Sequence, residues 1–71
     1  MSDLLPSIRV HALATGDRVY FGHTPFTITS TGQAPSGYSA AFLTVYARRD
    51  GAATDTFRVL HRDHSVVIAT V

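Results

Sequence analysis

A chain of 71 residues forms one domain at most, and a domain of this size buries only roughly 60% of the surface that its unfolded chain exposes. The residues are 45% hydrophobic and 15% charged, which excludes a disordered chain, and the absence of cysteine excludes disulfides and thiolate metal sites. The formal net charge is +1, well below that of domains that hold nucleic acid by bulk positive charge, so nucleic-acid binding would depend on local arginines.

Residues 1–12 are expected to form an N-terminal extension or an extra strand ahead of the main domain, residues 13–71. An extended run is expected over residues 8–13, with a single helical turn near residues 12–15. Asp3 and Pro6 stand where a secretory signal needs basic and apolar residues, and no segment approaches membrane-spanning length. We therefore expect a cytoplasmic protein without a membrane partner.

The main domain contains five runs of strand length, separated by turns rich in glycine, aspartate and proline. They cover residues 19–21, 26–31, 39–48, 56–61 and 65–71. The runs are rich in β-branched and aromatic residues, and no window has the apolar spacing of an amphipathic helix. Five short antiparallel strands cover their apolar faces most simply by curling into a barrel without free edges. The sequence thus predicts an all-β fold, a small five-stranded antiparallel SH3-like barrel with at most one short helical turn.

The Asp-Gly pair at residues 50–51 predicts a tight hairpin, because both residue types tolerate the positive backbone φ of such a turn. We expect residues 39–48 to pair with residues 53–60 across it. Alternation then assigns the faces of the two strands. The side chains expected to point inward are Leu43, Val45, Ala47, Phe57 and Val59. Arg58 and Leu60 are expected to face outward.

The segment LATGDRVYFGHTPFTITSTG, residues 13–32, resembles the opening of KOW-type and other SH3-like barrels, in which a Gly-Asp-x-Val turn leads a strand, a short turn and a second strand. The pattern is most similar to the N-terminal domain of bacterial elongation factor P and continues through APSGYSAAF, ARRDG and DTFRVLHRDHSVVIAT. The resemblance covers residues 13–70 and implies a fold rather than an activity. In that family the loop equivalent to residues 35–38 carries a lysine that reaches toward the ribosomal reaction centre. This chain has no lysine and no counterpart of the family's two further domains, so the translation role is not expected.

The loop formed by Pro35, Ser36, Gly37 and Tyr38 is the expected recognition loop. A polar and aromatic tip on a rigid barrel is a common arrangement for binding. The alternative is that proline and glycine only form a turn, with Tyr38 lying back on the barrel.

A mixed aromatic and basic surface is the expected binding face. Its members are Arg18, Tyr20, Phe42, Tyr46, Arg48 and Arg58. Tyrosine and arginine are enriched at protein interfaces, which favours a protein partner or a homo-oligomer. The same residue types also stack on bases and hold phosphates in barrels that bind single strands. A third interpretation is structural, with rings capping the core and arginine stems covering apolar surface.

Neither a catalytic site nor a metal site is expected. The sequence contains no nucleophile elbow, no phosphate-binding glycine loop and no glutamate, and a chain this short has little volume for a closed pocket. His61, Asp63 and His64 lie close together in sequence, but their spacing is not that of a zinc finger, so a solvated turn is expected. We therefore expect no enzyme activity, no cofactor and no small-molecule substrate.

These features predict a non-catalytic interaction module, which docks on a protein partner or self-assembles as an accessory subunit. All six basic residues are arginine, as a high-GC genome favours, and the expected setting is a bacterial or phage complex. The apolar final strand, residues 66–71, is expected to pair with another chain. The alternative hypothesis is a KOW-type barrel that binds RNA or DNA.

Overall fold

In the computed structural model, which describes residues 6–69, the chain forms one antiparallel sheet and a single 3-10 turn. In chain order these elements are β1 (Ser7–Arg9), η1 (Val10–Ala12), β2 (Arg18–Phe21), β3 (Thr24–Gln33), β4 (Phe42–Arg49), β5 (Thr56–His61) and β6 (Ser65–Ile68). The predicted all-β fold is confirmed, and the helical turn lies slightly earlier in the chain than expected. No helix in residues 6–69 is long and apolar enough to cross a membrane.

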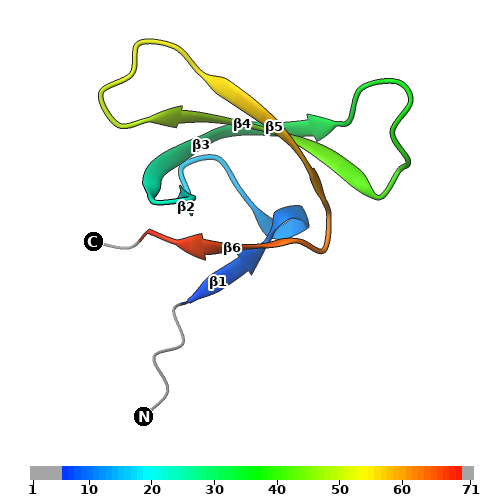
Figure 1. Ribbon diagram of the computed structural model, residues 1–71, viewed down its shortest axis with the longest axis horizontal. Helices are drawn as coiled ribbons and strands as arrows, with labels where there is room; N and C mark the ends of the chain where they lie inside the picture. Colours follow the sequence, from blue (N-terminus) through cyan, green and yellow to red (C-terminus); the bar gives the residue numbers. More distant parts are fainter. Residues whose placement is uncertain (1–5, 70–71) are drawn as a thin grey trace.

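The sheet has six strands within the described residues, in the order β1-β6-β2-β3-β4-β5. The long strands β3 and β4 curl across one side of the molecule, with β1 and β6 on the other (Figure 1). A register shift between Ile28 and Ser30 interrupts the pairing of β3 with β4, and such a bulge bends a strand. The sheet is open, because β1 and β5 remain as its two edges. The prediction of a closed five-stranded barrel is therefore not confirmed.

The hydrophobic core lies on the inner face of the curled sheet. Its fully buried side chains come from η1, β2, β3 and β4 and are Val10, Val19, Ile28 and Val45. Of the residues predicted to point inward from β4, Val45 and Ala47 are buried and Leu43 packs against the core. This prediction is confirmed. Phe21 of β2 and Phe26 of β3 add two rings, which meet edge-on with centroids 5.2 Å apart.

Strand β5 turns the opposite face to the core from the one predicted by alternation. Leu43 pairs with Leu60 and Val45 pairs with Arg58, and directly paired residues lie on the same face of a sheet. Leu60 and Arg58 therefore point inward, whereas Phe57 is 61% exposed. Both faces of β5 carry apolar side chains, so alternation could not choose between them. The pairing with β4 decides, because a shift of one residue exchanges the two faces.

The connection between β4 and β5 is longer than the predicted tight hairpin. Ala52 N donates to Arg49 O over 2.9 Å and Gly51 has a φ of +82°, but β5 begins only at Thr56. Among the described residues only glycines have a positive φ, so Asp50 does not adopt the conformation of a type I′ turn. The predicted partnership of the two strands is correct, and the loop that joins them is wider.

Strand β6 is an interior strand. Val66 pairs with Ile8 of β1, and Val67 pairs with Tyr20 of β2. Val67 is thus paired on both edges within this chain, whereas Ser65 and Val66 pair with β1 and Ile68 pairs with β2. These pairs occupy much of the strand that is expected to pair with another chain. Residues 70–71, which that expectation included, lie outside the described residues.

Candidate functional site

The outer face of β4 and β5 carries a row of aromatic rings. We call this row, Tyr38, Phe42, Tyr46, Phe57 and His61, the outer aromatic face. Tyr46 pairs with Phe57, with ring centroids 6.2 Å apart, and Phe42 pairs with His61, edge-on at 5.3 Å. Tyr38, in the loop before β4, packs against Phe42 at 5.5 Å. The rings therefore form two neighbouring clusters along one hairpin.

Three rings of this face are exposed to solvent, and packing of the fold does not account for their exposure. Tyr38 is 53% exposed and Tyr46 is 40% exposed, and with Phe57 they stand among the most exposed large hydrophobic side chains in residues 6–69. Single exposed rings are ordinary, whereas a contiguous apolar patch marks a site of interaction. Cross-strand aromatic pairing contributes only about 0.2–1 kcal/mol per pair. Sheet stability alone therefore gives little reason for this concentration of rings.

Two arginines of the predicted binding face are neutralised by aspartates. Arg18 of β2 and Arg48 of β4 both pair with Thr27 of β3, which places them on one face of the sheet. Arg18 forms an ion pair with Asp50, and Arg48 Nε donates to Asp55 Oδ1 over 2.8 Å. Partly exposed pairs of this kind stabilise a fold little, but they occupy the guanidinium groups.

The remaining members of the predicted binding face separate onto different surfaces. Phe42 and Tyr46 belong to the outer aromatic face. Tyr20 lies on β2 beside β6, and Arg58 lies on the inner face of β5 with its guanidinium carbon 4.8 Å from the ring centroid of Phe21. The structure thus brings together the aromatic residues of β4 and moves Arg58 away from them.

Two members of the outer aromatic face, Phe57 and His61, are absent from the predicted binding face. Alternation predicts Phe57 on the inside, and the sequence around His61 indicates only a solvated turn. A usable sign was present in the predicted hairpin: a two-residue turn at residues 50–51 would itself pair Val45 with Thr56 and leave Phe57 outside. The turn and the alternation pattern therefore predicted opposite faces for Phe57. The face predicted by the turn is the observed one, although the observed register pairs Val45 with Arg58.

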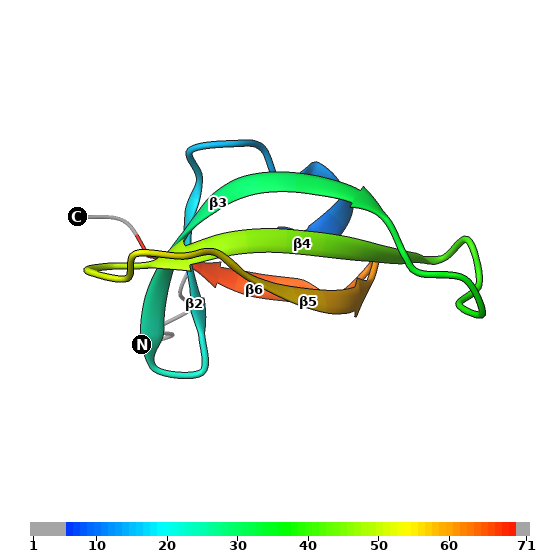
Figure 2. The same ribbon diagram turned by 90° about the horizontal axis from the view of Figure 1, so that it is seen from above.

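The predicted recognition loop extends past the ends of β3 and β4 (Figure 2). Residues 35–38 are exposed, Tyr38 N donates to Pro35 O over 3.2 Å, and Gly37 has a φ of +100°. The loop is therefore a turn, and its tyrosine ring lies against Phe42. A hollow of about 470 Å³ is lined by residues of this loop and of the start of β4. The loop thus lengthens the outer aromatic face.

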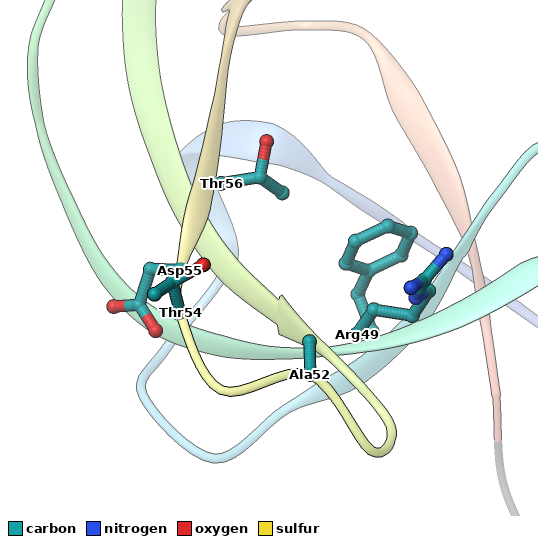
Figure 3. A pocket seen from close by; sticks show the side chains of 6 residues that line it. Arg49, Ala52, Thr54, Asp55 and Thr56 are labelled. Atoms are coloured by element: carbon teal, nitrogen blue, oxygen red, sulfur yellow. The ribbon is translucent and has the colours of Figure 1, made fainter.

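A pocket of about 290 Å³ lies between the start of β3, the end of β4 and the loop before β5 (Figure 3). Arg49, Asp55 and Thr56 are among its lining residues, and the Asp55 carboxylate lies on the side of the loop opposite Arg49 (Figure 3). That carboxylate accepts bonds from Arg48 Nε and from Thr29 Oγ1, at 2.8 and 3.0 Å. The lining therefore includes the guanidinium group of Arg49 and threonine hydroxyl groups, whereas the Asp55 carboxylate already accepts two hydrogen bonds from side chains that do not line the pocket.

The histidines at the turn between β5 and β6 lie in a solvated setting. Asp63 N donates to His61 Nδ1 over 3.1 Å, and His11 Nε2, from η1, lies 3.9 Å from Asp63 Oδ1. Within the part of the chain that the structure describes, no three side chains of histidine, cysteine or acidic type gather closely enough to hold a metal ion. The local bonds are those of a turn.

No known protein family matches this chain, and comparison with curated proteins finds no relative for it. The geometry of the surfaces therefore carries the functional argument.

Proposed function

We propose that this protein is a non-catalytic interaction module that binds a protein partner through the outer aromatic face. The observation that carries the proposal is the row of rings on β4, β5 and the loop before β4, three of which are 40–61% exposed. Aromatic side chains bury a large area at a low cost in conformational entropy, and they dominate the binding energy of protein interfaces. Two packed strands hold them in place before binding, which lowers the cost further.

A protein partner fits this face better than a nucleic acid. A nucleic acid would need free cations beside the rings, because its phosphates exchange counterions for lysine and arginine. Arg18 and Arg48 are already paired with Asp50 and Asp55, and Arg58 points to the other side of β5. The KOW-type RNA or DNA binder is therefore the less supported hypothesis.

The proposal extends to the type of fold. Support for a relation to SH3-like barrels comes from the Gly16-Asp17 turn that leads β2, the short turn into the long strand β3, and the long loop that enters β4. The additional strand β1 and the free edge of β5 are the departures from a closed five-stranded barrel.

Affinity capture from the native host with quantitative mass spectrometry tests the proposed function. The double variant Tyr46→Ser with Phe57→Ser is expected to lose partners that the unaltered chain captures. The matched control is His23→Ser, because His23 carries an exposed ring in the turn between β2 and β3, outside the outer aromatic face. Partners retained by the double variant, or lost equally in the control, would contradict the proposal.

Two further measurements separate the alternatives. Sedimentation over a concentration series shows whether the partner is a second copy of this chain. Titration with a short oligonucleotide at low and high salt tests the competing hypothesis, since phosphate contacts weaken steeply with added salt. Tight, salt-sensitive oligonucleotide binding that the double variant loses would replace the protein partner with nucleic acid.

A further inference from the structure

Strand β5 has one free edge. In the described residues it pairs with β4 alone and stands at the end of the strand order. Its six residues, TFRVLH, include no proline, lysine or acidic residue, and Arg58 is its one inward-pointing charge, so the strand carries few of the features that protect natural edge strands from pairing with another chain. The backbone N–H and C=O groups on this edge are therefore available to an added strand.

A cleft of about 310 Å³ lies between β5 and the facing strands β2 and β6. Phe21, Leu60 and Val66 give it an apolar lining. Polar groups come from Arg58, His64 and other residues of the same lining. Its volume is at the lower end of the range typical of ligand sites, which suits part of an extended chain.

Arg58 supplies a guanidinium group that no carboxylate neutralises among residues 6–69. The carboxylates of that part of the chain face other groups: Asp50 pairs with Arg18, Asp55 with Arg48, Asp63 lies toward His11, and Asp17 accepts from Ala14 N. The guanidinium instead lies over the ring of Phe21, which holds it at the cleft by a cation–π contact.

We infer that this cleft binds an extended, acidic segment of a partner protein, which pairs with the free edge of β5 and places an aspartate or glutamate on Arg58. A free strand edge is complementary to an extended backbone, and a planar guanidinium is complementary to a carboxylate, which it binds through two parallel hydrogen bonds. His64 also lines the cleft and adds an imidazole group that can donate a hydrogen bond. One arginine and one histidine do not make the continuous basic track that a nucleic-acid backbone needs.

The inference concerns the inner side of β5, opposite the outer aromatic face. It is independent of the proposed function, and different variants test the two proposals. A partner bound through the rings would be lost with Tyr46 and Phe57, whereas an acidic strand would be lost with Arg58.

Two-dimensional NMR of the isotope-labelled full chain tests the inference with two synthetic peptides. One probe is an octapeptide of alternating threonine and valine with a central aspartate, and the other has asparagine in place of the aspartate. The aspartate peptide is expected to shift the backbone amide signals of β5 and of the cleft residues Phe21 and Ser65. The asparagine peptide is expected to bind at least about fivefold more weakly, because a charge-assisted hydrogen bond is roughly twice as strong as a neutral one.

The variant Arg58→Gln is expected to bind both peptides equally. Arg49→Gln is the control, because Arg49 is an exposed arginine that lines a different pocket. The amide spectrum of each variant reports whether it folds. If Arg58→Gln does not fold, the comparison of the two peptides on the unaltered chain still tests the inference.

Three results would overturn the inference. These are an absence of shifts at millimolar peptide, equal affinity of the unaltered chain for both peptides, and shifts confined to the outer aromatic face. Displacement of the aspartate peptide by a short oligothymidylate at equal concentration would assign the cleft to nucleic acid instead. Peptide binding that persists in the Tyr46→Ser with Phe57→Ser variant is the result expected for an independent site.

Discussion

The two faces of the β4–β5 hairpin differ in the kind of side chain that they carry and in its exposure to solvent. The inner face of β4 presents Val45 and Ala47, each 1% exposed, whereas the outer face of the same hairpin presents Tyr46 and Phe57, which are 40% and 61% exposed. On β4 the buried hydrophobic side chains are therefore small and aliphatic and the large ring of Tyr46 lies outside, whereas the buried ring of the core, Phe26, comes from β3. This small domain thus leaves large aromatic side chains exposed on the outer face of the hairpin.

The largest expected effect is on stability, from a substitution that creates a cavity at the centre of the core. Ile28 of β3 is 0% exposed, so Ile28→Ala removes buried methyl groups and leaves a cavity. We expect a loss of about 2–5 kcal/mol in the free energy of unfolding, measured by urea denaturation. The milder Ile28→Val is expected to cost about 0.5–1.5 kcal/mol. Equal, small effects of both changes would mean that Ile28 is not at the centre of the core.

The outer face should show the reverse balance between stability and binding. Phe57→Ala removes one ring of a cross-strand pair, so the free energy of unfolding should fall by less than about 1 kcal/mol. Binding of the captured partner should weaken by at least about tenfold, because exposed aromatic rings at the centre of an interface are hot spots. Calorimetric titration of the purified partner measures the second effect. A large loss of stability with unchanged binding would show that Phe57 belongs to the fold instead.

The turn that joins the two strands depends on one glycine. Gly51 has a φ of +82°, which side chains other than glycine adopt at a cost, so Gly51→Ala should reduce the free energy of unfolding by about 1–2 kcal/mol. Gly32→Ala is the matched control, because Gly32 has no positive φ and a Cβ there meets no atom within 4 Å. A thermal melt compares the two. Equal melting temperatures would indicate a different turn conformation.

The smallest expected effect concerns the ion pairs beside the outer face. Asp55→Asn weakens the contact with Arg48, whose side chain is half exposed, so we expect a change of at most about 1 kcal/mol. A double-mutant cycle with Arg48→Gln measures the coupling between the two side chains. The coupling should shrink as salt is added, because exposed charges are screened. A coupling that does not respond to salt would show that the pair is more buried than the structure places it.

Several features of the site follow from local pattern, and several do not. The positions of the central strands and the inward set of β4 were predictable, because a period of two along an extended chain separates its faces without reference to any partner. The rings Phe42 and Tyr46 were recognisable as outward for the same reason. The partners of the arginines were not, since Arg18 and Asp50 are 32 residues apart in sequence and meet only across the sheet.

The sequence by itself determined that this chain is an all-β domain with a small aliphatic core and aromatic residues to spare. Tertiary structure alone decided that β6 lies between β1 and β2, that the sheet stays open at β5, and that Phe57 faces water while Arg58 turns toward Phe21. The physical reason is that strand pairing is a long-range choice. Both faces of β5 are partly apolar, so only its register with β4 determines which side chains the core takes and which remain for a partner.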